Sequence, residues 1–161
     1  MAVRADWHPR VGEDRQRRPR MMRELLVSTA MVILTVLVHG SGLVVLARLL
    51  GLEKRRESAE HLHPASLRGL GIVLFTVLAI VGLHGLEIWL YGLLYLAVGA
   101  IGSLREAIYF STITYGAIGY SDSVMAERWR LVSAIEGING IVMIGWSTAL
   151  LIRVVGLLRR V

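Results

Sequence analysis

The sequence has no cysteine, which excludes a disulfide framework, a thiolate metal site and a cysteine nucleophile. Proline is scarce, with 3 among 161 residues, and charged residues make up only 19% of the chain. Hydrophobic residues account for 55%, and the mean hydropathy of +0.60 is high for a soluble domain. The length suffices for one domain, and this composition indicates a domain embedded in a membrane.

Long runs without charge dominate the rest of the chain. Leu25–Ala47 contains no Asp, Glu, Lys or Arg, whereas Gly69–Gly102 contains only Glu87 and Leu131–Ile152 only Glu136. A helix needs about 20 predominantly apolar residues to cross the hydrocarbon core of a bilayer, and each run is long enough. The sequence therefore predicts an all-α integral membrane protein with three transmembrane helices.

The net charge of +6 is concentrated beside these runs. Seven arginines lie within the first 23 residues, and Lys54–Arg56 follows the first run. Basic residues that flank apolar spans match anionic lipid headgroups, so we expect contact with membrane lipids and no binding of nucleic acid. We expect four regions: a basic segment at 1–22 that is disordered or lies on the headgroups, a transmembrane helix at 23–50, a charged cytoplasmic connector at 51–68, and a larger membrane domain at 69–158.

A polar stretch, Tyr109–Ser123, interrupts the second half of the chain with the sequence YFSTITYGAIGYSDS. Backbone outside a helix is tolerated at membrane depth only where it is buried in protein or lines a water-filled path. A short helix followed by a glycine-containing turn fits a re-entrant loop. Gly116 and Gly119 would permit the unusual backbone angles of an extended strand that climbs out again. A polar external loop is the alternative.

The same stretch resembles the signature of potassium channels, which has the form T-x-T-T-x-G-Y-G-D after an aromatic-rich pore helix. Thr114–Asp122 reads TYGAIGYSD. The matching positions are Thr114, Ile118, Gly119, Tyr120 and Asp122, with Tyr109, Phe110 and Ser111 at the aromatic start of the pore helix. The resemblance implies a pore domain at 69–158, with an outer helix at 69–102, a pore helix at about 104–115, a filter at 116–122 and an inner helix at about 129–158.

The resemblance also implies a function, that of a passive cation channel subunit of a bacterial inner membrane and not an enzyme. Four copies assemble in this family, and backbone carbonyls, here those of Ala117–Ser121, replace the water around potassium. The permeant monovalent cation is the only bound group implied, and no cofactor is expected. Asp122 would tie the filter to the pore helix through Tyr109, Thr114 would support it, and Gly140 stands where the family has its inner-helix hinge.

Three positions depart from the family signature. Gly116 and Ala117 replace the two filter threonines, and Ser121 replaces the second filter glycine. Losing the second threonine removes one ring of hydroxyl ligands, and a serine in a left-handed backbone costs on the order of 1 kcal/mol. We therefore expect relaxed potassium selectivity. The alternative is a non-conducting regulatory or sensor membrane protein with a degenerate pore loop.

Ionisable residues inside the apolar runs are His39, His84, Glu87 and Glu136. Such groups are costly in lipid and usually face protein or water. Helical spacing places His84 and Glu87 on one face of the second run, together with Tyr91 and Tyr95. We therefore expect a buried polar network behind the filter, in which Glu136 supports the filter.

His39, His84 and Glu87 allow more than one interpretation. They form either a structural hydrogen-bond network between packed helices or a proton-sensing one, because histidine titrates near physiological pH. His84 and Glu87 also resemble a metal pair. The sequence offers no third ligand nearby, so no metal is expected beyond the permeant cation. No nucleophile or cofactor motif supports an intramembrane enzyme that uses His84 and Glu87.

The basic residues of the connector and those of the N-terminus give opposite indications of how the chain is oriented in the membrane. The resemblance puts the filter outside, so that the basic connector 51–68 lies inside, as the positive-inside rule requires. The N-terminus would then lie outside with its seven arginines, which contradicts the rule. Two explanations stay open: translation begins at Met21 or Met22, or the first apolar run does not cross completely.

Overall fold

The computed structural model describes residues 11–51, 67–119 and 123–159, with only the backbone at 11–17 and 159. Several expectations fall outside the described residues. They concern residues 1–10 of the basic segment, 52–66 of the connector, and Tyr120, Ser121 and Asp122 of the filter.

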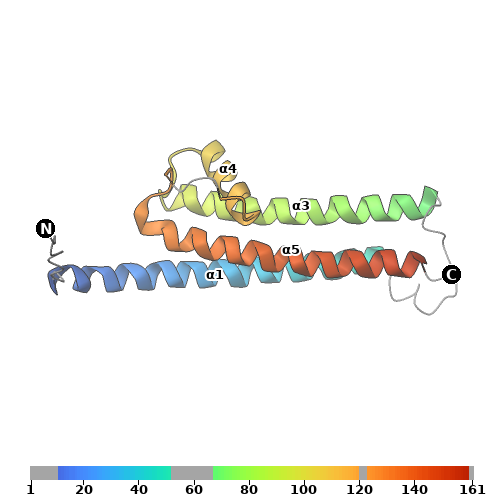
Figure 1. Ribbon diagram of the computed structural model, residues 1–161, viewed down its shortest axis with the longest axis horizontal. Coiled ribbons are helices and arrows are strands. Elements are labelled where there is room, and N and C mark those ends of the chain that lie inside the picture. Colours follow the sequence, from blue (N-terminus) through green and yellow to red (C-terminus); the bar gives the residue numbers. More distant parts are fainter. Residues whose placement is uncertain (1–10, 52–66, 120–122, 160–161) are drawn as a thin grey trace, which may run out of the picture.

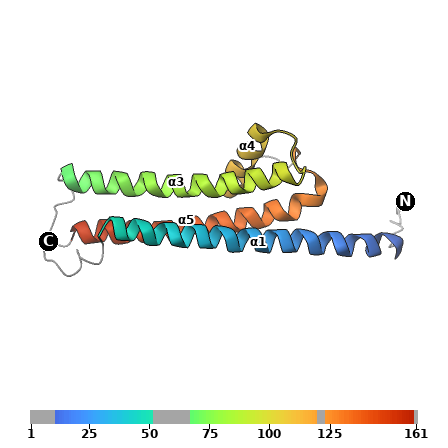
Figure 2. The ribbon, with the colours of Figure 1, turned by 180° about the vertical axis from the view of Figure 1, so that it is seen from behind.

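Three long helices lie side by side: α1 (Val11–Leu49), α3 (Leu67–Ala97) and α5 (Arg130–Arg159). Two short helices join the last two: α4 (Leu104–Tyr115) and the 3-10 helix η1 (Glu127–Trp129). α1 and α5 run in the same direction and α3 runs against them (Figures 1 and 2). All three long helices are long and apolar enough to cross a membrane, and the parts of the chain described contain no strand. The predicted fold class is confirmed.

α1 is longer than the sequence predicted. It begins at Val11 and contains Pro19, so the expectation of disorder is wrong for residues 11–22. That expectation weighed charge and proline too heavily, because Arg, Glu, Gln and Met are good helix formers and an existing helix extends more readily than a new one nucleates. At 1.5 Å per residue α1 is about 58 Å long, roughly twice the hydrocarbon core of a bilayer.

α3 ends at Ala97 and not at 102, because a C-terminal cap closes it. Gly99 has a φ of +63°, the amide of Ala100 donates to the carbonyl of Tyr95 at 2.8 Å, and the amide of Gly99 donates to that of Leu96 at 3.1 Å. These two bonds with a left-handed glycine form a Schellman motif, a common end of helices. Gly99 was therefore a signal for the helix end in the sequence.

α4 spans the range expected for a pore helix. The hydroxyl of Ser103 accepts from the amide of Glu106 at 3.2 Å and caps its first turn. α4 starts at the end of α3, dips along α3 toward the middle of the bundle, and the chain then returns to the same end (Figure 1). A Cβ added at Gly92 would lie 2.5 Å from Cδ1 of Ile108, so the absence of a side chain lets α3 and α4 approach closely.

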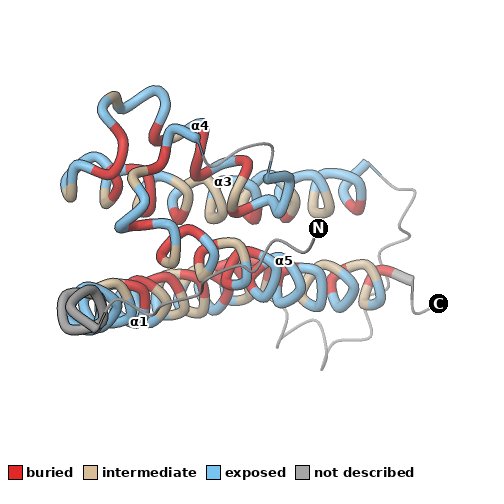
Figure 3. The backbone as a smooth tube through the Cα atoms, turned by 60° about the vertical axis from the view of Figure 1, so that its left-hand side comes forward, coloured by how far each residue is buried: buried red, intermediate tan, exposed pale blue. Residues whose placement is uncertain are grey.

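The core has two apolar clusters with a polar layer between them. The cluster at the α4 end includes Tyr95, Phe110 and Trp129, and the cluster at the opposite end includes Leu46 and Val154. The buried residues line the facing sides of the helices, and the outward sides are exposed (Figure 3). Many exposed side chains are leucine, isoleucine and valine, as expected of a surface that meets lipid or other subunits.

Candidate functional site

The turn after α4 is a second Schellman motif. The amide of Ile118 donates to the carbonyl of Ile113 at 2.8 Å, and that of Ala117 donates to the carbonyl of Thr114 at 2.9 Å. Ala117 holds the left-handed position with a φ of +56°, which is costly for a residue with a Cβ. This is the arrangement that Gly99 provides at the end of α3.

Two expectations about this turn are wrong. Gly116 has a φ of −74°, so it does not supply an unusual angle, whereas Gly119 does with a φ of +54°. The chain at 116–119 is also not an extended strand, because the amides of Ile118 and Gly119 both bond back to the carbonyl of Ile113. Its side chains are accessible in a single chain, with Ile118 56% exposed.

Tyr109 and Thr114, which the sequence predicted to support the filter, lie on different sides of α4. Tyr109 is 60% exposed and points away from the bundle, whereas Thr114 is partly buried. The carbonyl of Thr114 faces α5, where a Cβ added at Gly137 would lie 3.4 Å from it. The bond expected between Tyr109 and Asp122 stays a prediction, because Asp122 is outside the described residues.

Glu136 joins α5 to both neighbouring helices. Its carboxylate accepts from the hydroxyl of Ser111 on α4 and from that of Tyr95 on α3, each at 2.5 Å. Ser111 lies 3.0 Å from the carbonyl of Ile88 as well. Glu136 is completely buried, and a buried carboxyl group is costly unless hydrogen bonds satisfy it. The carboxylate thus links α3, α4 and α5 at the middle of α4.

Asn139, one helical turn further along α5, links α5 to α1. Its amide nitrogen lies 2.9 Å from the hydroxyl of Thr35 and 3.5 Å from that of Tyr91. All three residues are buried. Side-chain hydrogen bonds between helices contribute roughly 0.6 kcal/mol each in membrane proteins, so these bonds orient α1 more than they stabilise it.

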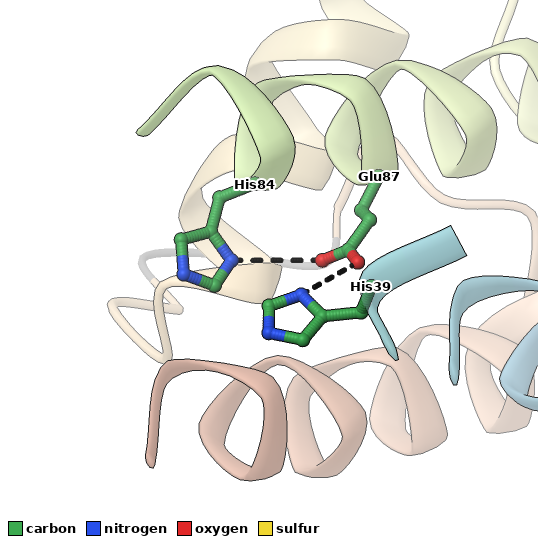
Figure 4. A group of neighbouring side chains, drawn as sticks. All are labelled: His39, His84 and Glu87. Carbon is green, nitrogen blue, oxygen red and sulfur yellow. Dashed lines mark hydrogen bonds and ion pairs between the residues drawn. The ribbon is translucent and has the colours of Figure 1, made fainter. Parts of the chain in front are cut away.

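Glu87 is the centre of a third group. His39 on α1 lies 2.9 Å from one carboxylate oxygen, and His84 lies 3.5 Å from the other, to which the hydroxyl of Tyr115 donates (Figure 4). Tyr115 also contacts His84 at 3.0 Å, and the second nitrogen of His39 lies 3.1 Å from the hydroxyl of Ser147. Three of the four ionisable residues singled out in the apolar runs of the sequence therefore meet.

The expectation that His84 and Glu87 lack a third metal ligand is wrong. Ligand atoms of His39, His84 and Glu87 all lie within 4.8 Å of one another. His39 comes from α1, 45 residues before His84 in the chain, and no spacing rule in a single sequence links such distant positions. The packing of α1 against α3 brings it into place.

Gly140 lies directly against the end of α4. A Cβ added there would lie 2.2 Å from the carbonyl oxygen of Tyr115 and 2.9 Å from its carbonyl carbon. α5 is a continuous helix through this position. Close packing against the pore helix is therefore a sufficient reason for the glycine, and its role as a gating hinge stays a prediction.

A family model described as an ion channel matches residues 76–156, half of the chain. The chain belongs to this ion channel family. The resemblance to the potassium-channel pore-loop family is confirmed, and the matched part contains α4, most of α3 and α5, and both buried glutamates. α1, with Thr35 and His39, lies outside the match. No curated protein and no solved structure matches the chain significantly.

The sequence reasoning missed several residues of the network in this ion channel protein, namely Thr35, Ser111, Tyr115 and Ser147. A signal existed for Thr35, which stands four residues before His39 and shares its helical face. Ser111 and Tyr115 also lie four residues apart on α4, on the side that faces α3 and α5. Their roles could be recognised only once the partners, Glu136 and Glu87, were placed opposite them.

Proposed function

We propose that this ion channel protein is a passive cation channel subunit that assembles as a homotetramer and conducts potassium. The observation that carries the proposal is α4 itself. It is a short capped helix that lies between α3 and α5 in the chain, packs against both of them through Ser111, and ends in the turn Gly116–Gly119, inside the region matched by the family. Irregular backbone at this depth fits a water-filled path.

The mechanism follows from the backbone. Carbonyl oxygens of Ala117–Ser121 from four chains would surround the axis and replace the hydration shell of the ion, and repulsion between successive ions would drive exit. The carboxylate of Glu136 supports this arrangement, because it holds Ser111 of α4 against α3 and α5. Since no threonine hydroxyl is available at Ala117, we expect weaker discrimination between potassium and sodium than a complete filter gives.

The membrane is the inner membrane of a bacterium in this proposal, with the α4 end of the bundle outside. The N-terminal end of α1 lies at the α4 end and the C-terminal end of α5 at the other (Figure 1). The length of α1 agrees with a helix that crosses completely. Lipid contacts fall on the exposed leucines and valines of the outward faces.

Flux measurements on the purified protein in liposomes test the proposal. A potassium gradient should dissipate with the native protein and persist with Gly119→Asp, which places a carboxylate and a Cβ at a left-handed filter residue. Gly102→Asp is the matched control, because Gly102 is also exposed in a loop and nothing lies within 4 Å of its added Cβ. A verified tetramer that passes no monovalent cation would contradict the proposal.

A second candidate is a non-conducting regulatory or sensor subunit. The amides of Ile118 and Gly119 are bonded back onto α4, and Ala117 occupies the left-handed position, which favours a closed turn over an extended filter. The double substitution Ala117→Thr with Ser121→Gly separates the two candidates. Conduction by the double variant alone supports this second candidate, and conduction by the native protein excludes it.

A further inference from the structure

His39, His84 and Glu87 bring three metal-ligating atoms to one point inside the bundle (Figure 4). Nδ1 of His39 lies 2.9 Å and Nδ1 of His84 lies 3.5 Å from the nearest carboxylate oxygen of Glu87, and all three ligand atoms lie within 4.8 Å of one another. Metal–ligand bonds of about 2.0–2.2 Å hold two ligands at most about 4.4 Å apart. Small side-chain rotations would therefore bring the three ligand atoms to bonding distance of one metal ion. We propose that these residues form a binding site for a divalent transition metal of the zinc class.

The donor set decides which metals fit. Two imidazole nitrogens and one carboxylate oxygen form a ligand set that zinc uses in proteins, with a fourth position left open. Imidazole suits zinc, copper, nickel and cobalt, whereas magnesium and calcium prefer ligand sets made of oxygen. The site is thus distinct from the carbonyl-lined filter proposed for the permeant cation.

The hydrogen bonds around His39 prepare its free nitrogen for a metal. Nε2 of His39 lies 3.1 Å from the hydroxyl of Ser147. When Nε2–H donates to Ser147, Nδ1 carries the lone pair, and its 2.9 Å contact with Glu87 requires one proton between the two atoms. A metal ion would take the place of that proton, with Nδ1 of His39 and the carboxylate of Glu87 as its ligands, while Nε2 keeps its contact with Ser147. Partners that fix the second nitrogen of a ligating histidine in this way are typical of metal sites.

Charge and access also favour a metal ion. Glu87 is completely buried, and no arginine or lysine occurs in Gly69–Gly102 or Leu25–Ala47 to balance its carboxylate. An ionised carboxylate inside a membrane is costly unless it is paired. The imidazoles in contact with Glu87 are charged only when protonated, and a divalent cation held by neutral imidazoles would balance the carboxylate without that protonation. His39 is completely buried, but the side chain of His84 is 15% exposed and provides the route of entry.

A bound metal would connect three helices. His39 belongs to α1, His84 and Glu87 belong to α3, and the hydroxyl of Tyr115 at the end of α4 contacts both His84 and Glu87. Tyr115 is therefore the candidate for the fourth ligand. Because α1 lies outside the family match, the metal would fasten this additional helix to the pore domain directly behind the filter turn.

Cobalt binding tests the proposal without any measurement of conduction. The full chain, purified in detergent without a polyhistidine tag, is titrated with Co²⁺, and visible absorption and metal content are recorded after desalting. We expect one cobalt per chain with the intense bands of tetrahedral coordination, and displacement of the cobalt by zinc. Ser147→Ala should weaken cobalt binding by about 10–100-fold.

Two variants make the result specific to this site. His84→Cys places a single thiol in a chain that has no other, so a thiolate-to-cobalt charge-transfer band in that variant locates the metal at position 84. The matched control, His61→Gln with His63→Gln, should keep the native stoichiometry. The proposal is overturned if the native protein retains no cobalt, if the control loses the binding, or if a monodisperse His84→Cys protein shows no such band.

Discussion

At the scale of single residues, Ala117 adopts a left-handed backbone conformation that its Cβ disfavours. It takes the left-handed position in a capping motif that a glycine fills at the end of α3. Glycine adopts this conformation without a Cβ clash, which costs other residues about 1–2 kcal/mol. Since the potassium-channel signature has a threonine at this position, we expect the residue to bear on stability and, in the proposed channel, on ion selectivity.

Ala117→Gly should therefore stabilise the protein by about 1 kcal/mol, because it removes the clash at a positive φ. Thermal unfolding of the detergent-solubilised protein measures the change. Ala126→Gly is the matched control, since Ala126 has an ordinary φ of −62°, and there the greater backbone freedom of glycine should destabilise the protein slightly. Equal shifts of the same sign for both variants would show that Ala117 is not strained.

Ser111 offers a second residue-scale prediction. Ser111→Ala removes one of the two hydroxyls that donate to the buried carboxylate of Glu136, and we expect a loss of roughly 1 kcal/mol in the free energy of unfolding. Thr112→Ala is the control on the same helix, because Thr112 is exposed and, among the described residues, its hydroxyl donates only to the carbonyl of Ile108 in the preceding turn. A loss for Thr112→Ala as large as that for Ser111→Ala would contradict the bracing role.

At the scale of elements, the pore helix could be predicted well from the sequence and the surrounding polar layer only in part. The aromatic stretch and the pore-loop signature indicated α4 because these signals are local, and the spacing of Ser103 and Glu106 is a further local signal that the sequence reasoning did not use. Glu87 and Glu136 were recognised as buried because charge inside an apolar run is rare. The grouping of His39 with His84 depends on how α1 packs against α3, which no local pattern encodes.

The contact between α4 and α5 gives the element-scale prediction. Gly140→Ala places a Cβ 2.2 Å from the carbonyl oxygen of Tyr115, so the pore helix must shift and the protein should lose thermal stability and assembly. Gly145→Ala on the same helix has open space and should be neutral or slightly stabilising. Size-exclusion chromatography and thermal unfolding compare the two. Unchanged stability with altered channel opening in Gly140→Ala would instead favour the hinge.

At the scale of the whole molecule, the outward faces of the described helices are strongly apolar. The part of α5 opposite the polar layer exposes Ile138, Ile141 and Val142. In the proposed tetramer α5 is the inner helix, so this face would meet other copies or the pore. α1 exposes residues such as Leu37, which would meet lipid.

Cysteine cross-linking separates these two faces in a chain that has no cysteine of its own. Ile141→Cys should form disulfide-linked pairs of chains on oxidation in the membrane, whereas Leu37→Cys, similarly exposed and apolar in the single chain, should not. Native mass spectrometry of the unlinked protein should give four chains per particle. Pairing at Leu37→Cys without pairing at Ile141→Cys would place α5 on the outside and contradict the proposed assembly.

The whole molecule also shows where sequence reasoning met its limit. Three membrane spans and the re-entrant helix followed from composition, spacing and the pore-loop signature. The first twelve residues of α1 did not, because charge was weighed above helix propensity. The turn at Ala117 was unexpected, since the signature suggested an extended backbone and the hydrogen bonds to Ile113 close a helix instead.

The most direct test of the central claim is the current through the purified protein in a planar bilayer with potassium on one side and sodium on the other. We expect discrete openings that carry potassium, and a reversal potential that shows a preference for potassium weaker than that of a filter with both threonines. We expect a stronger preference in Ala117→Thr with Ser121→Gly. A tetramer that shows no cation current under any gradient, or a current carried by anions, would contradict the claim.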